Sequence, residues 1–520
     1  MIGDLEVKYN EMKSGKGKIL DGLPIIFLAL LNICIHLLVI NNLEYHRDEL
    51  LYFSLGEHPD FGFATVPPMI GWIALLMEKT LGFSLFSARF IPALLSGVLI
   101  LLVSEIAKEM GGSMYSRILA GIGITISGFA LRSFSLFMPV CIDVFFWTTI
   151  FYLVIRYINT SSGRYLILLG VAAGFSLLNK YLIGILFLSL VIVIPFTQYR
   201  RLFNERSFWI GILGAFIVFL PNLIWQVDHG LPVINHMAEL GRTQLAHVNR
   251  LDFLADQLIM PSFASVLSIA GLIYLFLNKD AVKFRFLGGV SVLVVAFLFI
   301  LRGKGYYTIG IFPFLIAAGA VSYEGLRKLW KKIVLVIVLI LLTIPMLPLW
   351  LPVYSSSGLV KYFKNLELKY GIVIGRRFEN GSIHSLPQDY ADMLGWEELT
   401  SITNKAYQMI PDKKAGLIYC ENYGQAGAIT IIGKKYGLPE AVCFSESFRY
   451  WVPEKFDPDI TSFIYINDEL GEDVKKLFSK ITLVGKISNP DAREYGTAVY
   501  LCENPNLSFN EFWNDRLKRL

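Results

Sequence analysis

Residues 45–52 read Tyr45-His46-Arg47-Asp48-Glu49-Leu50-Leu51-Tyr52 and directly follow the first long apolar segment, residues 23–43. Two carboxylates beside an arginine and a histidine are costly at the mouth of a membrane-spanning helix. Membrane proteins retain ionisable groups in such places mainly for function. We therefore take Asp48 as the candidate reacting carboxylate of a membrane enzyme and the rest of the chain as its support.

The composition of the whole chain is that of a membrane protein. Only 17% of its 520 residues are charged and 54% are hydrophobic, whereas a soluble protein carries about 25% charged residues. Several apolar runs are long enough to cross about 30 Å of hydrocarbon. The net charge of +5 comes from cations between these runs, so nucleic acid is not an expected partner. The sequence predicts a polytopic α-helical membrane protein.

The spacing of the apolar runs predicts about eleven spans and sets their orientation. Lys and Arg concentrate in alternate connections, beginning with the segment 1–22, which the positive-inside rule places in the cytoplasm. With an odd number of spans, everything after residue 351 is extracytoplasmic. The expected spans are 23–43, 90–107, 118–136, 139–155, 165–179, 181–197, 207–225, 258–277, 286–301, 307–323 and 333–351.

Two long loops between spans are expected on the extracytoplasmic side of the membrane. The first, residues 44–87, contains an apolar stretch from Pro67 to Phe83 that is too short to span and suits a helix lying in the interface. The second is residues 226–257. A charged break at Asn179-Lys180 separates two apolar halves, as in a tight turn or beside a polar cavity.

The composition changes after the last span, and residues 352–520 are expected to form a small extracytoplasmic α/β domain. Strands are expected at 416–420, 462–466, 481–484 and 497–501, and helices at 387–410, 427–436 and 468–478. No glycine-rich nucleotide-binding pattern occurs in it. The five cysteines and the loop histidines match no metal-site spacing, so neither a metal nor a cofactor is predicted.

Acidic and basic residues gather at the expected outer ends of the spans. The carboxylates are Asp48, Glu49 and Asp143, and the cations include Arg89, Lys180 and Lys304. Cations at this depth can bind a lipid phosphate, and a carboxylate can take the proton of a hydroxyl. Together they could move a group from a phosphate to an acceptor. An enzyme on the outer face would need a donor carried by the membrane, such as a polyprenyl-phosphate sugar.

The order of several short motifs resembles the GT-C glycosyltransferases of family 39, which include protein O-mannosyltransferases and bacterial lipid A aminoarabinose transferases. The motifs are Asp48-Glu49-Leu50-Leu51-Tyr52, Val66-Pro67-Pro68-Met69-Ile70, Ser87-Ala88-Arg89-Phe90-Ile91-Pro92, Cys141-Ile142-Asp143-Val144-Phe145-Phe146-Trp147, Leu177-Leu178-Asn179-Lys180-Tyr181, Lys304-Gly305-Tyr306-Tyr307 and Asn422-Tyr423-Gly424-Gln425-Ala426-Gly427-Ala428. The resemblance covers most of the chain. Val66 departs from it, because many members have histidine there.

The resemblance implies a GT-C fold in residues 23–351 and an inverting transfer of a monosaccharide from a polyprenyl-phosphate donor. In such a reaction Asp48 is the general base, and Glu49, Arg89, Asp143, Lys180 and Lys304 bind the substrates. The acceptor is a lipid, a glycan or a protein, and membrane lipids are further partners. The oligosaccharyltransferase Trp-Trp-Asp-Tyr-Gly motif is absent, which argues against that branch of GT-C enzymes.

Each candidate residue also has a structural explanation. Glu49 could orient a neighbour, Arg89 could anchor the end of a span, and Asp143 could cap its helix after Pro139. Lys180 and Lys304 could anchor turns at the interface, and the Tyr423-Gly424 pair suits a strand-to-helix turn better than an acceptor site. A transporter or flippase for a lipid-linked substrate, or a non-catalytic membrane anchor, remain alternative functions.

Overall fold

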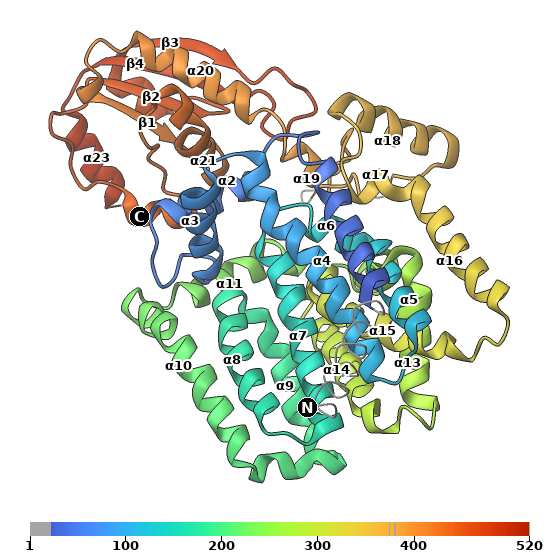
Figure 1. Cartoon of the computed structure of the whole chain (residues 1–520). Helices are drawn as coiled ribbons and strands as arrows, with labels where there is room; N and C mark the ends of the chain where they lie inside the picture. The colour runs from blue at the N-terminus through green and yellow to red at the C-terminus, as the bar shows by residue number, and fades with distance from the viewer. Residues whose placement is uncertain (1–21, 374, 379–380, 519–520) are drawn as a thin grey trace, which may run out of the picture. The chain divides into compact units, whose positions relative to one another are not determined.

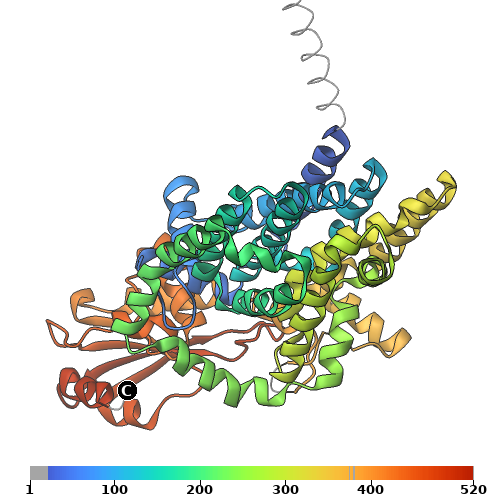
Figure 2. The same cartoon turned by 90° about the horizontal axis from the view of Figure 1, so that it is seen from below.

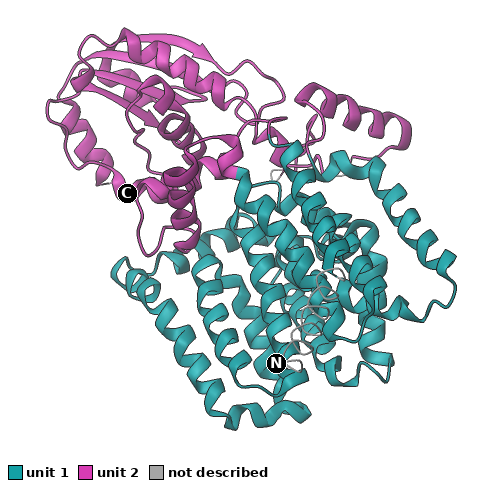
Figure 3. Cartoon of the chain, viewed as in Figure 1, with its two compact units in different colours: residues 1–40, 89–351 teal, residues 41–88, 352–520 magenta. Residues whose placement is uncertain are grey.

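The computed structural model describes residues 22–373, 375–378 and 381–518 of the chain. Contacts between Cα atoms divide the chain into two compact units (Figure 3). Unit 1 comprises residues 1–40 and 89–351, and unit 2 comprises residues 41–88 and 352–520. The predicted cytoplasmic segment lies, except for Gly22, outside the described residues.

Unit 1 is a bundle of helices in both views of the chain (Figures 1 and 2). Its first helix is Gly22–Leu38. The others are α4 (Leu85–Glu109), α5 (Met114–Thr125), α6 (Gly128–Ser133), α7 (Pro139–Thr160), α8 (Arg164–Asn179), α9 (Gly184–Val193), α10 (Arg206–Asp228), α11 (Pro232–Thr243), α12 (Arg250–Ile259), α13 (Ser265–Leu277), α14 (Arg285–Ile300), α15 (Phe312–Ser322), α16 (Leu329–Thr343) and α17 (Leu347–Trp350). The boundary between the units falls within α4.

Within the described residues, 6 helices are long and apolar enough to cross a membrane, or up to 8 if each sharply bent helix pair forms one span. The expectation of about eleven spans therefore stays a prediction. Two of the expected spans are short, because the first helix and α8 lie in the range of 10–17 residues. Another, 118–136, is divided between α5 and α6, and the second external loop contains two helices, α11 and α12.

Small residues allow helices of unit 1 to approach closely. A Cβ atom added at Gly170 of α8 would lie 2.0 Å from the carbonyl oxygen of Gly211 in α10. The same holds for α13 and α15, where a Cβ at Gly319 would lie 1.9 Å from the carbonyl oxygen of Leu267. Such backbone contact is typical of membrane helices, which are held together by close packing rather than by exclusion of water.

Unit 2 contains a mixed four-stranded sheet with strand order β1-β2-β4-β3. The strands are β1 (Gly416–Cys420), β2 (Ser462–Asn467), β3 (Phe478–Lys486) and β4 (Ala498–Pro505), and the helices are α2 (Arg47–Glu57), α3 (Met69–Leu81), α18 (Ser356–Tyr370), α19 (Gln388–Ala391), α20 (Trp396–Met409), α21 (Tyr423–Ile431), α22 (Glu472–Leu477) and α23 (Phe509–Leu517). β1 runs parallel to β2, and β4 is antiparallel to both β2 and β3. The predicted small α/β fold and its four strands are confirmed.

The core of this sheet lies partly under α23. Leu417, Phe463 and Cys502 are aligned across three neighbouring strands and belong to one buried cluster with Trp513 of α23. The indole nitrogen of Trp513 donates to the carbonyl of Pro453 at 2.8 Å, so its burial leaves no polar group unsatisfied. The sheet therefore gives β1, and the turn that follows it, a rigid base.

Two of the unit's helices come from the first predicted external loop. α2 and α3 pack against each other, and α2 also packs against α21, which follows β1. The predicted interfacial segment Pro67–Phe83 contains α3, which starts after Pro68. This loop and the C-terminal segment thus fold together in unit 2, although the expected domain boundaries placed them apart.

Candidate active site

The backbone at the start of α2 is held by two side chains on either side of Asp48. The backbone N–H of Asp48 donates to Nδ1 of His46 at 3.1 Å, and the backbone N–H of His46 donates to the Glu49 carboxylate at 2.9 Å. This is a capping box in which histidine replaces the usual serine or threonine. The carboxylate of Asp48 lies in the first turn, where the helix dipole stabilises negative charge.

The Asp48 carboxylate is held on one side and open on the other. The hydroxyl of Tyr423 donates to its Oδ1 at 2.8 Å. Its Oδ2 accepts no hydrogen bond from the described residues, and the nearest ion-pair contact, Nδ1 of His46, is 3.9 Å away. The side chain is 29% exposed. Asp48 therefore has one oxygen held by Tyr423 and one that accepts no hydrogen bond from the described residues.

A buried arginine lies behind this pair. The guanidinium of Arg47 stacks over the ring of Tyr423, 4.3 Å from its centre, and lies 3.8 Å from the carboxylate of Asp392. Asp392 in turn accepts from Arg493 at 3.1 Å. Burial raises the pKa of Asp392, and the positive charges of Arg493 and Arg47 oppose that rise. This alternation of charges fixes the wall of the site next to Asp48.

The predicted cations and Asp143 lie in unit 1, where three of these side chains are close enough for their charges to interact. Lys180 lies in the break after α8, as the sequence predicts, and faces the charges of both Asp143 and Lys304. Its ammonium lies 5.3 and 5.2 Å from the ring centres of Tyr306 and Tyr307. The rings hold the half-buried Lys180 ammonium by cation–π attraction, and an ammonium group can form charge-assisted hydrogen bonds with an anion.

Asp143 is buried in α7 and supports this cluster. Its carboxylate accepts from the indole N–H of Trp147 at 3.1 Å, and the adjacent Asn179 donates to the carbonyl of Pro139 at 3.0 Å. The second of these bonds fixes the end of α8 against the start of α7, and the first fixes the Asp143 side chain along α7. Asp143 is thus a charge partner of Lys180, and its predicted contact with substrate stays a prediction.

Arg89 and Glu49 make structural contacts that the sequence also allowed. Arg89 is 2% exposed, and its guanidinium donates to the carbonyl of Ile40 at the end of the first helical segment. Glu49 is fully buried and caps α2. Their predicted contacts with substrate stay predictions.

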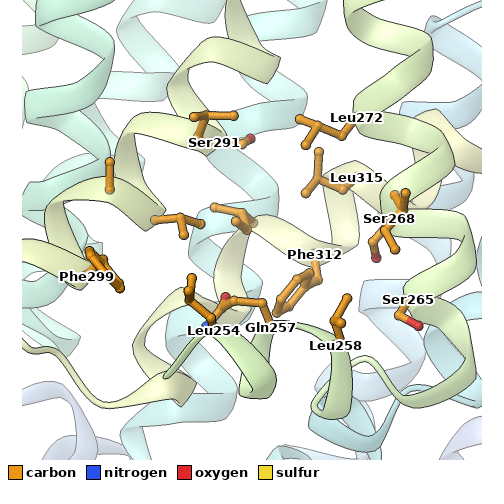
Figure 4. A pocket seen from close by; sticks show the side chains of 15 residues that line it. Leu254, Gln257, Leu258, Ser265, Ser268, Leu272, Ser291, Phe299, Phe312 and Leu315 are labelled. Carbon is orange, nitrogen blue, oxygen red and sulfur yellow. The ribbon is translucent and has the colours of Figure 1, made fainter. Parts of the chain in front are cut away.

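An apolar cavity of about 400 Å³ opens in unit 1 between α12, α13, α14 and α15. Its lining side chains point into a common space (Figure 4). The hydroxyls of Ser268 and Ser291 donate to carbonyls of their own helices, so they add little polarity to the wall. The cavity suits a hydrocarbon chain.

The α12 wall of this cavity is joined to the segment that follows Lys304. The amide oxygen of Gln257, which lines the cavity, accepts from the hydroxyl of Thr308 at 2.7 Å. Thr308 belongs to the 3-10 helix Gly305–Ile311. A Cβ at Gly305 would lie 2.1 Å from Oδ2 of Asp256. The start of this 3-10 helix therefore touches α12.

The contribution of Tyr423 was not predicted from the sequence. Its motif was assigned to a strand-to-helix turn, and that assignment is confirmed, since β1 ends at Cys420 and α21 begins at Tyr423. The contact with Asp48 joins residues 375 positions apart. The available signal was that this motif and the Asp48 motif both belong to the same resemblance.

Comparisons with known proteins identify the fold of the chain. A crystal structure of ArnT from Cupriavidus metallidurans bound to undecaprenyl phosphate matches with a TM-score of 0.61 and 12% identity, over 92% of this chain and 97% of ArnT. The structure of the same protein in the apo state matches with a TM-score of 0.58 and 11% identity, over 94% and 98% of the two chains. The chain has the GT-C fold.

Sequence comparisons relate this GT-C chain to family 39. The family model described as dolichyl-phosphate-mannose-protein mannosyltransferase matches residues 65–225. The lipid A galacturonosyltransferase RgtD of Rhizobium johnstonii is 24% identical over 221 residues, which are 41% of this chain and 46% of RgtD. The chain thus spans about half the length of this curated relative. The predicted resemblance to family 39 and the predicted fold are confirmed.

Proposed function

We propose that this GT-C protein is a membrane glycosyltransferase that moves a monosaccharide from a polyprenyl-phosphate donor to an acceptor hydroxyl, with inversion. The observation that carries the proposal is the Asp48 carboxylate, which is fixed through one oxygen and open at the other. The match to ArnT and the family-39 similarity support the reaction class.

Asp48 is assigned the role of general base. The proton of the acceptor hydroxyl passes to Oδ2, and the hydroxyl oxygen attacks the anomeric carbon from the side opposite the phosphate. The bond between that carbon and the phosphate oxygen breaks, and its electrons leave with the polyprenyl phosphate. The configuration at the anomeric carbon inverts because one displacement takes place.

Lys180 and Lys304 are assigned to the donor phosphate. Their positive charges offset the charge that grows on the leaving phosphate, which is the largest electrostatic demand of the reaction. Asp143 holds Lys180 in place and keeps the buried cluster from carrying only positive charge. Arg89 stays a predicted phosphate ligand.

The apolar cavity in unit 1 is assigned to the first part of the polyprenyl chain. An apolar cavity of about 150 Å³ accommodates benzene, so one of about 400 Å³ has room for a short length of this chain. ArnT was crystallised with undecaprenyl phosphate, which makes a lipid of this class the first donor carrier to test.

The reaction is proposed for the extracytoplasmic face of the cell membrane, with a cytoplasmic N-terminus and an extracytoplasmic C-terminal segment. Nucleotide-activated sugars do not reach that face, which accounts for a lipid-linked donor. The acceptor is a lipid, a glycan or a protein, and RgtD, named for transfer to lipid A, makes a lipid acceptor the first candidate.

The test uses purified protein in lipid vesicles with undecaprenyl phosphate carrying radiolabelled mannose or galacturonic acid. Sugar release or transfer is compared among the wild type, Asp48→Asn and Asp515→Asn. Asp515 forms an exposed ion pair with Lys518 and controls for loss of one carboxylate in the same unit. We expect Asp48→Asn to lose at least about 100-fold in rate and Asp515→Asn to behave like the wild type.

Undiminished transfer by Asp48→Asn would refute the base assignment. Faster movement of labelled lipid between leaflets, without cleavage of the sugar–phosphate bond, would instead support the flippase alternative.

A further inference from the structure

We propose that Tyr423 is a positioning residue for Asp48, so that the C-terminal segment completes the reaction centre. This inference rests on the proposed role of Asp48 as the base. The Tyr423 hydroxyl occupies Oδ1 of Asp48 and thereby directs Oδ2 toward the acceptor. Tyr423 keeps its own proton throughout the reaction, while Oδ2 receives the proton of the acceptor.

The local sequence explains why Tyr423 lies at this point. Asn422 is the N-cap of α21, and its side-chain oxygen accepts from the backbone N–H of Gln425 at 3.0 Å. The amide groups of Asn422 and Gln425 both donate to the carboxylate of Glu494, at distances between 2.8 and 3.3 Å. The first turn of α21 is therefore tied to the strand-bearing part of unit 2.

Two glycines set the separation between α21 and α2. A Cβ at Gly424 would lie 3.4 Å from Cβ of Arg47 and 2.9 Å from the Trp396 ring. A Cβ at Gly427, three residues later on the same face, would lie 3.0 Å from the backbone carbon of Leu50. The absence of side chains at these two positions lets α21 approach α2 closely enough for the Tyr423 hydroxyl to reach Asp48.

The phenol of Tyr423 is suited to donate at any working pH. Burial raises the pKa of Tyr423 well above its usual value, and the neighbouring negative charge of Asp48 raises it further. The Arg47 guanidinium over the ring keeps the phenol in place. A neutral, half-buried and stacked phenol is a fixed hydrogen-bond donor rather than a second titrating group.

No other side chain of unit 2 described by the structure donates to Asp48. The neighbouring His46 accepts the backbone N–H of Asp48 at Nδ1, so that nitrogen carries a lone pair and is not a donor. The remaining charged groups around Asp48 in this unit are Arg47 and Glu49 on α2 and Asp392 before α20, with Arg493 and Glu494 beyond them. The orientation of the carboxylate therefore depends on Tyr423.

The experiment compares Tyr423→Phe with Tyr465→Phe in the full-length protein in vesicles. Tyr423→Phe keeps the ring under Arg47 and removes only the hydroxyl. Tyr465 is the matched control, since its hydroxyl also donates to a carboxylate of the same unit, Glu421, at 2.7 Å. Transfer is measured with the donors named above, between pH 5 and 9, and folding is checked by thermal melting.

We expect Tyr423→Phe to lower kcat by about tenfold across this pH range, with no change in KM for the donor, because the variant still binds the donor but no longer holds the carboxylate in the reactive orientation. Tyr465→Phe should leave both kcat and KM unchanged.

A second readout does not need a working donor. The carboxylate stretching band of Asp48 is followed by infrared difference spectroscopy and is identified by its loss in Asp48→Asn. A changed frequency of this band in Tyr423→Phe alone supports the proposal, because the variant removes the hydrogen bond to Oδ1. An unchanged band in a folded Tyr423→Phe protein overturns it, as does an equal change in Tyr465→Phe.

The two proposals fail in different ways. Loss of transfer in Asp48→Asn with wild-type behaviour of Tyr423→Phe would overturn the role of Tyr423 and leave the base assignment standing. Undiminished transfer in Asp48→Asn would remove the base assignment, and with it the catalytic meaning of the Tyr423 contact.

Discussion

Replacing Gly427 by alanine tests whether the spacing between α21 and α2 controls the reaction. The added methyl group would lie 3.0 Å from both the backbone carbon and Cβ of Leu50, whereas carbon atoms in ordinary contact are about 3.5–4.0 Å apart. α21 must therefore move away from α2 by roughly 0.5 Å. Overpacking of this kind costs about 1–3 kcal/mol, and the higher helix propensity of alanine offsets about 1 kcal/mol of it.

The same displacement acts on the hydrogen bond to Asp48. Tyr423 lies one turn before Gly427 on α21, so a movement of roughly 0.5 Å lengthens its 2.8 Å contact with Asp48 to roughly 3.3 Å, beyond the usual range. We expect Gly427→Ala to lower kcat by about three- to tenfold and to lower the melting temperature by a few degrees at most.

Gly241→Ala is the control for this change. Gly241 lies within α11, and a Cβ there meets no atom within 4 Å, so only the helix-propensity gain remains. In the assay, kcat and thermal melting are measured for both variants and for Gly427→Ala combined with Tyr423→Phe. If the glycine acts through Tyr423, the double variant is no slower than Tyr423→Phe alone. A folded Gly427→Ala protein with wild-type kcat would refute the reasoning.

Two further predictions concern the cation cluster and pH. Lys180→Met and Lys304→Met should each weaken binding of a fluorescent undecaprenyl phosphate by about 10- to 100-fold, because a hydrogen bond to a charged group is worth about 1.5–3 kcal/mol. The control Lys434→Met removes a lysine from an exposed cluster of unit 2 and should leave the affinity unchanged. Unchanged affinity in Lys180→Met and Lys304→Met would contradict the phosphate assignment. Burial raises the pKa of Glu44, and the hydrogen bonds that it accepts from the backbone of residues 395–397 oppose this rise. Ionised Glu44 therefore lowers the stability of unit 2 above its folded-state pKa. This cost disappears as the pH falls toward about 4.5, the pKa of glutamate in the unfolded chain. The stability of Glu44→Gln relative to the wild type, measured by tryptophan fluorescence melting, should therefore be greater at pH 7 than at pH 5, and an equal difference at the two values would count against it.

Local sequence signals single out the candidate base and one of the candidate cations, and both roles stay predictions. Asp48 and Glu49 stand out because charge follows an apolar segment directly, and Lys180 stands out because it interrupts one. The sequence also permits the capping role of Glu49, because Glu49 follows His46 at the spacing of a capping box. The four strands were predicted from short apolar runs between turn residues, a local pattern that can be recognised without knowledge of the fold.

The features that depend on distant residues were not predictable. Tyr423 meets Asp48 only after the sheet and α2 have packed together, and nothing near Tyr423 indicates that partner. The helix expected at 427–436 begins earlier, at Tyr423. Gly424 and Gly427 lower the helix propensity of this first part, but the same glycines allow it to pack against α2. The number of membrane spans was difficult to predict because several helices are short or sharply bent.

The discontinuity of unit 2 has a consequence for biosynthesis. Its two parts, residues 41–88 and 352–520, are separated in the chain by roughly 260 residues, which take roughly 13 to 50 seconds to translate at about 5–20 residues per second. During that interval α2 has been made but α21 has not, so the growing chain holds Asp48 without the hydroxyl that donates to it. A ribosome that stops before residue 423 would leave Asp48 without this contact, and a C-terminal segment exchanged between relatives would have to bring a matching α2 with it.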